Sequence, residues 1–295
     1  MTDPIVIAAG ADEAYGVPLG VTLVSAVRRV RPGRRVQVHV LDGGLSTGTR
    51  DALLAALERA RPGVEARFHR GVEARTRGVK TGKYLSSAAY LRLLIPDLLE
   101  GPRALYLDSD LVVQRDLTAL WDTPLRQAVG AVQDEGVRSL SDVGLVALGA
   151  DRGRYFNSGV MVLDLDTWRR QKVADAVFDD LRSNAERYWH KDQDALNVVL
   201  GDAWDAVDPR WNVQVPANTY LPGALPTDQA FVLHYTTGSK PWNHVARSAR
   251  TRRHYRAWYR ELRLSGLASA ADRIRIHATR LRVAARTLAR GRRPR

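Results

Sequence analysis

The chain of 295 residues contains no cysteine, and this absence excludes several kinds of chemistry. Without thiols there can be no disulfide, no thiolate nucleophile and no zinc site built on sulfur. No stretch approaches the run of about 18 uncharged apolar residues that a membrane span needs. The segment Met1–Ile5 lacks the basic start and apolar core of a signal peptide. We therefore expect a cytoplasmic protein.

The net charge of +13 is concentrated at the C-terminal end of the chain. Residues 246–295 hold 16 arginines and two acids, so the first 245 residues carry 29 basic and 30 acidic groups. A nucleic-acid-binding protein that uses this basic tail is the alternative from another functional class. Because the charge is confined to the tail and no helix-turn-helix or RNP-like motif stands out, nucleic acid is not the expected partner.

Short apolar runs alternate with helical patterns along the chain, which predicts an α/β fold with a mostly parallel, Rossmann-like sheet flanked by helices. Such sheets bind ligands at the carboxyl ends of their strands. We expect one domain over residues 1–245 and a basic, helical extension over 246–295. The expected strands are 4–9, 36–41, 64–68, 104–107, 128–132, 159–165 and 231–233, and the expected helices are 18–31, one capped by Ser46 or Thr47, 86–99, 167–188 and 194–200.

Two carboxylates, Asp108 and Asp110, directly follow the apolar run Leu105–Leu107. Residues two apart at a strand end lie on the same side, with Cα atoms roughly 6.5–7 Å apart. Hard divalent cations prefer oxygen ligands, and Mg²⁺ typically takes one or two carboxylates together with substrate phosphates. The pattern is common by itself, so a polar loop after a strand is an equal alternative.

Three further segments carry polar side chains next to apolar runs. His234 follows Phe231–Leu233 and offers an imidazole to a metal, and Lys240 places an ammonium where a phosphate could sit. Either Asp192 or Asp194 caps the following helix, or Asp192 and Gln193 face a polar substrate such as a sugar at its N-terminus. Asn157 stands immediately before a strand, where it serves either a hydroxyl or a turn.

The order of these segments resembles that of the family 8 glycosyltransferases, over about residues 5–242. The resemblance rests on Ala11–Tyr15, Ala89–Arg92, Tyr106–Asp110, Leu117–Trp121, Phe156–Gly159, Asp192–Asp194, His234 and Lys240–Trp242. It implies a GT-A type fold, a UDP-sugar donor, Mn²⁺ or alternatively Mg²⁺, and transfer of a hexose, galactose or glucose, with retained configuration. The acceptor would be a hydroxyl of a glycan or glycolipid.

The resemblance also implies roles for single residues. Asp108, Asp110 and His234 would be the metal ligands, and Asp192, Gln193 and Asp194 would lie at the reacting sugar. The donor would contact Asp12, Tyr15, Arg92, Asp108, Ser109, Asn157, Gly238 and Lys240. Two positions depart from the family pattern: Ala14 replaces a frequent asparagine, and Thr237 stands where a glycine is expected.

The sequence leaves both double displacement and front-face attack open as mechanisms of retention. Gln193 would lie beneath the sugar ring and is a poor nucleophile, which favours front-face attack, whereas Asp192 and Asp194 are candidates for covalent capture. A self-glycosylating, glycogenin-like protein is an alternative because ten tyrosines offer acceptors. A nucleotidyltransferase would carry a Gly-rich, basic loop after the first strand, which residues 10–15 lack.

The tail repeats an apolar residue every seven positions, with arginines on both sides. Such a basic amphipathic helix predicts a peripheral contact with an anionic membrane, at about 1 kcal/mol per arginine near the surface. A helix packed on the domain and a disordered end are the alternatives. The repeat consists of Leu267, Ile274, Leu281 and Leu288.

Overall fold

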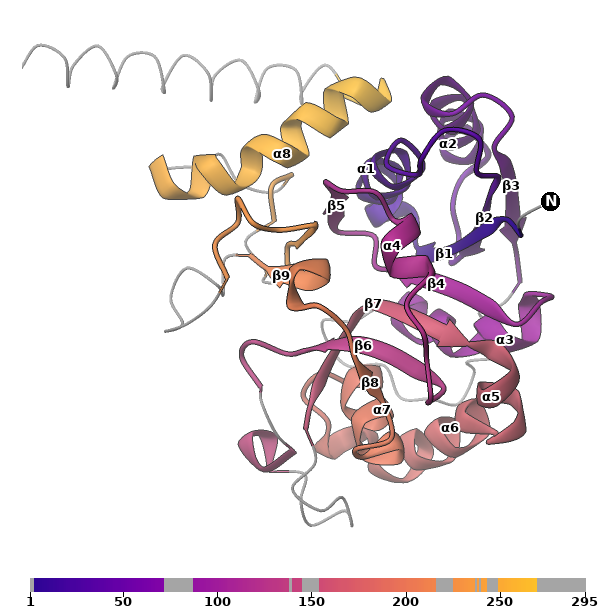
Figure 1. Cartoon of the computed structure of the whole chain (residues 1–295), viewed down its shortest axis with the longest axis vertical. Coiled ribbons are helices and arrows are strands. Elements are labelled where there is room, and N and C mark those ends of the chain that lie inside the picture. Colours follow the sequence, from indigo (N-terminus) through magenta and orange to yellow (C-terminus); the bar gives the residue numbers. More distant parts are fainter. Residues whose placement is uncertain are drawn as a thin grey trace, which may run out of the picture.

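The computed structural model describes residues 3–71, 87–137, 140–144, 154–215, 225–236, 238, 240–242 and 249–269. Within these residues the chain forms a mixed α/β fold built on a seven-stranded sheet of order β3-β2-β1-β4-β7-β6-β8 and a three-stranded sheet of order β5-β10-β9 (Figure 1). The strands are β1 Ile5–Ala11, β2 Val36–Asp42, β3 Glu65–His69, β4 Arg103–Leu107, β5 Leu111–Val113, β6 Val129–Gln133, β7 Phe156–Asp164, β8 Asp205–Ala206, β9 Val213–Gln214 and β10 Val232–His234.

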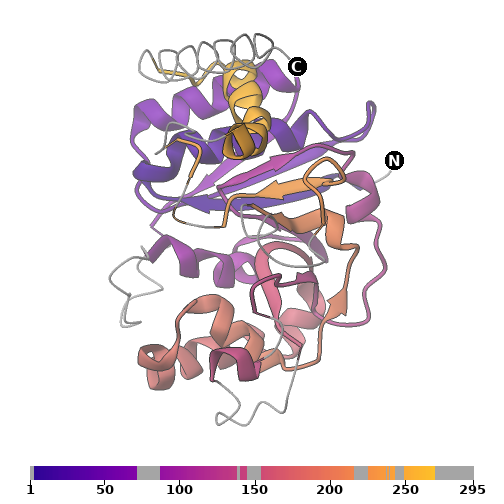
Figure 2. The same cartoon turned by 90° about the vertical axis from the view of Figure 1, so that its left-hand side faces the viewer.

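Helices cover both faces of the large sheet, as the edge-on view in Figure 2 shows. One layer contains α1, α2 and α8, and the other contains α5, α6 and α7 with the 3₁₀ segment η3. Strand β1 is almost completely buried, as expected for a central strand covered on both faces. The helices are α1 Gly16–Val27, α2 Thr47–Ala60, η3 Ser87–Leu94, α3 Ile95–Leu98, α4 Thr118–Trp121, α5 Leu165–Arg170, α6 Val173–Asn184, α7 Asp192–Leu200 and α8 Ala249–Ser265.

The directions of the strands place several strand ends at one edge of the sheet. β1 pairs in parallel with β2 and β4, whereas β7 runs antiparallel to both β4 and β6. The carboxyl ends of β1, β4 and β6 therefore lie beside the amino end of β7. Strands β2 and β3 lie on one side of β1, whereas β4 lies on the other, so the order of the strands reverses at β1. Open α/β sheets bind ligands at such a topological switch point.

The α/β class, the mostly parallel sheet and its flanking helices are confirmed, but two local predictions are wrong. The expected helix 86–99 is helical over residues 87–98 and differs only in type, because the 3₁₀ segment η3 is followed by α3, whose first turn contains Pro96, where the missing N–H costs nothing. The expected helix 167–188 is interrupted at Lys172, which has a φ of 50°. Strand β7 begins at Phe156, so Asn157 lies inside the strand and not before it.

Helix α8 packs on the same body as α1 and α2 (Figure 1). Its buried Glu261 pairs with Arg28 and Arg29, at 3.3 and 3.1 Å. The predicted boundary at residues 245 and 246 falls just before this helix, and α8, the first part of the predicted extension, packs on α1 and α2. The division of the chain at this boundary stays a prediction. Among the described residues, no helix has the length and apolar character needed to cross a membrane. The predicted amphipathic repeat lies almost entirely in residues 270–295, outside the described residues.

Candidate active site

A cavity of about 660 Å³ lies at the edge where these strand ends meet. This volume is within the usual range for a small-molecule site. Asp12 follows β1, Asp108 follows β4, Asp134 follows β6 and Asn157 is the second residue of β7, and all four line the cavity. His234 closes β10 and reaches the same cavity from the smaller sheet.

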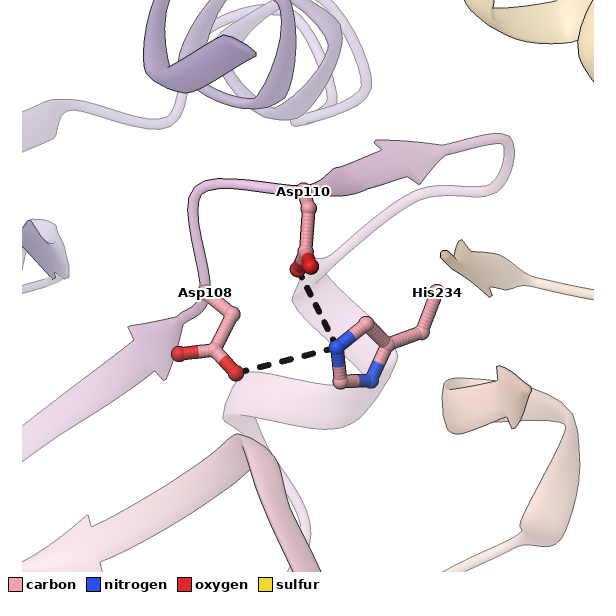
Figure 3. Close-up of side chains that lie close together, drawn as sticks. All are labelled: Asp108, Asp110 and His234. Atoms are coloured by element: carbon pink, nitrogen blue, oxygen red, sulfur yellow. Dashed lines mark ion pairs between the residues drawn. The ribbon is translucent and has the colours of Figure 1, made fainter. Parts of the chain in front are cut away.

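Asp108, Asp110 and His234 bring three potential metal-ligand atoms within 4.8 Å of one another (Figure 3). The His234 Nε2 atom lies 3.7 Å from Asp108 Oδ2 and 3.1 Å from Asp110 Oδ1. Around an octahedral ion with bonds of about 2.1 Å, neighbouring ligand atoms are about 3 Å apart. The two distances from His234 Nε2 are close to this spacing, so the three side chains form a candidate site for a single divalent cation.

Each of these three side chains has its other polar atom bound by the protein. Asp108 Oδ1 accepts hydrogen bonds from Tyr106 at 2.6 Å and is paired with Arg92 at 3.0 Å. Asp110 Oδ2 is paired with the Lys240 ammonium at 2.5 Å, whereas its buried Oδ1 atom has no hydrogen-bond partner. The remaining atoms all point toward one shared centre, as ligands prepared for a cation do.

A chain of hydrogen bonds fixes the tautomer of His234. Asn157 donates to Asp134 at 2.9 Å, Asn212 donates to Asn157 at 2.8 Å, and the His234 Nδ1 atom lies 2.9 Å from Asn212 Oδ1. Because Asp134 can only accept, both amides are oriented and Nδ1 must be the donor of His234. With Nδ1 as the donor, Nε2 is the ring atom that faces the two carboxylates and is the atom available to a cation between them.

Gly159 is required by the packing of this cluster. A Cβ atom at this position would lie 2.2 Å from His234 Cε1 and 2.8 Å from Asp108 Oδ2. Asp108 is in turn held by its own backbone N–H, which donates to the Gly159 carbonyl at 2.8 Å. The glycine of the segment Phe156–Gly159 thus allows strand β7 to approach the ligands closely.

Charge compensation continues on the other side of Asp108. Arg92 is buried, lies over the Tyr106 ring at 4.7 Å and pairs with Asp108 and, at 2.9 Å, with Asp192. Burial raises the pKa of Asp192 to about 6, although Arg92 acts in the opposite direction. Burial would also raise the pKa of Asp110, but Lys240 and His234 outweigh it and hold that pKa well below its usual range.

The predicted catalytic residues Asp192 and Gln193 line the cavity, but Asp194 does not. Asp194 is fully buried, accepts a hydrogen bond from Tyr155 and accepts another from the His190 N–H at 2.6 Å. This placement does not support Asp194 as a group that captures the sugar. The alternative that Asp192 or Asp194 caps α7 is also wrong. The cap residue is Lys191, and its side chain makes no capping hydrogen bond at this helix end.

The predicted donor contacts are brought together with one exception. Asp12, Tyr15, Arg92, Ser109, Asn157 and Lys240 line the cavity, whereas the exposed Gly238 does not. Asp12 accepts from the Tyr15 N–H at 3.2 Å, and the Tyr15 ring packs edge-on against Trp242 at 5.6 Å. The individual roles of these residues toward a donor stay predictions.

Several residues of the cavity wall, or of the hydrogen-bond chain behind it, were not predicted from the sequence, and four of them bear on the site. Asp134 follows an apolar strand just as Asp108 does, so the same signal was present in the sequence. Asn212 and Gln214 flank a strand of two residues, which is too short to give a pattern. Trp189 carries no pattern either, because a single exposed tryptophan in a loop has no periodicity.

The sequence model of the family described as "Glycosyl transferase family 8" matches residues 6–246. The chain belongs to this family. The glycosyltransferase is 30% identical to General stress protein A of Bacillus subtilis (strain 168) over 262 residues, which are 79% of this chain and 85% of that protein. It is 33% identical to the lipopolysaccharide 1,2-glucosyltransferase of Escherichia coli (strain K12) over 174 residues, 54% of this chain and 50% of that protein.

The fold of the glycosyltransferase is similar to that of the galactosyltransferase LgtC, whose crystal structure contains donor and acceptor sugar analogues. The TM-score is 0.74 at 27% sequence identity, and the similarity covers 92% of this chain and 100% of LgtC. The GT-A type fold expected from the sequence is thereby confirmed. Family membership further implies a sugar donor and a glycan or lipid acceptor.

The packing at Gly159 predicts a selective loss of metal binding. In Gly159→Ala, the added methyl group must displace His234 or Asp108, so Mn²⁺ affinity should fall about tenfold or more. Isothermal titration calorimetry with MnCl₂ measures this affinity. The control is Gly48→Ala in α2, where a Cβ atom meets nothing within 4 Å, and it should bind as wild type. Unchanged Mn²⁺ binding by Gly159→Ala would show that the cation binds elsewhere.

The raised pKa of Asp192 predicts a pH-dependent difference in stability. A carboxyl group with a pKa near 6 in the fold and near 3.9 when unfolded stabilises the fold at low pH, and this contribution is lost as the pH rises from about 4 to about 6. The free energy of unfolding of Asp192→Asn, relative to wild type, should therefore increase over this range by at most about 3 kcal/mol. Urea unfolding in EDTA between pH 4 and 7 tests this; a constant difference would mean an ordinary pKa.

Proposed function

We propose that this glycosyltransferase transfers a hexose, galactose or glucose, from a UDP-sugar to a hydroxyl of a glycan or glycolipid, with Mn²⁺ and with retained configuration. The observation that carries the proposal is the cluster of Asp108, Asp110 and His234, in which each side chain presents one unbound atom to a common centre. A diphosphate leaving group needs a dication at such a place. The donor and acceptor analogues bound to LgtC give further support.

The ligand atoms favour Mn²⁺ over Mg²⁺. Mg²⁺ takes almost exclusively oxygen ligands, whereas an imidazole nitrogen suits a transition-metal dication. Asp108, Asp110 and His234 would hold this ion. A bound dication would supply Lewis-acid stabilisation of the negative charge that develops on the departing nucleotide diphosphate.

Lys240 supports the same leaving group. Its ammonium neutralises Asp110 in the structure and lines the cavity. Once a dication compensates Asp110, the ammonium no longer needs to stay on that carboxylate and is free to contact a phosphate oxygen. Burial would lower the pKa of Lys240, but Asp110 outweighs it and raises that pKa, so the side chain stays positively charged.

The geometry of Gln193 supports front-face attack over double displacement. Its carbonyl oxygen accepts from the Ser158 N–H at 3.0 Å, and its amide nitrogen donates to Tyr155 and Asp134 at 3.2 and 3.3 Å. An amide oxygen that already accepts a hydrogen bond is a still weaker nucleophile. The acceptor hydroxyl would then attack from the side of the leaving phosphate and pass its proton to a phosphate oxygen, while the anionic Asp192 stabilises the positive sugar centre.

We further propose that the protein works in the cytoplasm, with its tail on the cytoplasmic face of an anionic membrane. The exposed Arg256, Arg260 and Arg263 on one face of α8 support this placement. Residues 270–295, which carry most of the predicted membrane contact, lie outside the described residues.

Donor and metal dependence are tested together by UDP release from a panel of UDP-sugars, with Mn²⁺ or with EDTA. Wild type should release UDP from one or two sugars, and EDTA should abolish the release. Asp110→Ala should lower the rate about a hundredfold or more, because it removes a ligand and leaves Lys240 without its partner. The control Asp179→Ala removes a carboxylate of which 76% is exposed and should behave as wild type. No release and no metal-dependent UDP binding would refute the donor assignment.

A further inference from the structure

Gln214 contributes a hydrogen-bond donor to the cavity that no group of the described protein uses. The side chain lines the cavity, the residue is only 3% exposed, and its Nε2 atom has no hydrogen-bond partner. Two other buried atoms of the cavity have no hydrogen bond, but each lies next to a side chain that can compensate it. Asp110 Oδ1 faces the His234 imidazole, and Asp192 Oδ2 faces the Arg92 guanidinium. Leaving a buried amide unpaired costs free energy, so a ligand oxygen is the expected partner.

Gln214 reaches the cavity from the small sheet, on the side that also carries His234. It lies beside His234 in the parallel pairing of β9 and β10, and two residues after Asn212, so its side chain shares their side of the small sheet. The polar atoms of Arg92 in η3, Ser158 in β7 and Gln193 in α7 already bond to one another. The groups near the leaving diphosphate are charged, whereas Gln214 is neutral and suits a hydroxyl.

Trp189 marks the entrance of the same cavity. Its side chain lines the cavity although the residue is 82% exposed. Among the described residues, three other large hydrophobic residues are exposed, Val17, Leu54 and Leu264, and none of them lines the cavity. An exposed indole at a binding site offers a rigid apolar face at a low entropy cost.

We propose that Trp189 and Gln214 form the acceptor subsite, in which a pyranose ring of the acceptor stacks on the indole and one of its hydroxyls accepts a hydrogen bond from Gln214 Nε2. A pyranose has both features that this pair can recognise, a face of C–H groups and a rim of hydroxyls. The exposed indole lies where a second substrate can enter after the donor. The inference rests on the proposed function, because only a transferase needs an acceptor beside the donor.

The test measures acceptor binding separately from donor turnover. The probes are methyl α- and β-glycosides of glucose and galactose and their monodeoxy analogues, followed by saturation-transfer NMR in the presence of UDP and Mg²⁺. The variants are Trp189→Ala, Trp189→Phe and Gln214→Met, with Leu54→Ala as the control for loss of an exposed apolar side chain. Metal-dependent UDP binding by each variant is measured by calorimetry.

Trp189→Ala should weaken glycoside binding about tenfold, and Trp189→Phe should retain most of it, because a ring restores the platform. Gln214→Met should weaken binding of the parent glycosides about tenfold but bind one monodeoxy analogue as wild type does, because the lost donor matches the lost hydroxyl. Leu54→Ala should change nothing. UDP affinity should stay within about twofold of wild type in all four variants, which is well below the tenfold loss of glycoside affinity expected for Trp189→Ala and Gln214→Met.

Three results would overturn the subsite: wild type binds no glycoside at millimolar concentration, the variants bind glycosides as wild type does, or they lose UDP affinity to the same extent as glycoside affinity. The last result would assign both side chains to the donor. Failure of the proposed function is a different result, in which wild type neither binds UDP with a metal nor releases it from any UDP-sugar. Glycoside binding is read without donor turnover, so the two failures are distinguishable.

Discussion

Five carboxylates line the cavity, and the arrangement around four of them follows from the need to compensate their charge. Asp108 and Asp110 lie in the connection between β4 and β5, Asp134 follows β6, and Asp192 begins α7. A buried anion without a partner is strongly unfavourable. Arg92 pairs with Asp108 and Asp192, and Lys240 pairs with Asp110. Asp134 is satisfied by amide donors, including the backbone N–H groups of Gly136 and Val137 at 2.8 and 2.9 Å.

These pairings leave one carboxylate oxygen of Asp108, one of Asp110 and one nitrogen of His234 facing each other. The hydrogen-bond chain from Asp134 through Asn157 and Asn212 engages Nδ1 of His234, so the nitrogen that faces the carboxylates is Nε2. This hydrogen-bond chain connects both sheets, since Asn157 lies in β7 of the large sheet and His234 in β10 of the small one. The fold thus holds the cluster through hydrogen bonds that do not depend on a bound ion, and Gly159 provides the room for it.

The sequence predicted the parts of this arrangement that produce a local pattern. An apolar strand followed by carboxylates is visible in the sequence at Asp108 and Asp110. Asp134 also follows a strand, β6, and belongs to the same pattern. Long apolar runs such as β1 and helices with clear periodicity such as α2 were predicted within a few residues. The break between α5 and α6 at Lys172 was not predicted, because no feature of the sequence indicates a left-handed backbone at a lysine.

What the sequence could not give is contact between distant residues. Lys240 and Asp110 are 130 positions apart, and Asn212 and Asn157 are 55 apart. Asp194 illustrates the same limit: the sequence made it a candidate for covalent capture beside Asp192, but helix α7 turns it away from the cavity toward Tyr155. The docking of α8 through Glu261 was hidden by the strongly basic composition around it.

The central claim is that Asp108, Asp110 and His234 hold one dication beside the leaving diphosphate. Anomalous X-ray diffraction at the manganese edge, from crystals grown with MnCl₂ and UDP, tests it most directly. The account predicts a single strong peak bonded to these three side chains, with the Lys240 ammonium moved from Asp110 to a phosphate oxygen. The absence of a peak there, with UDP bound and the Lys240–Asp110 pair intact, would contradict it.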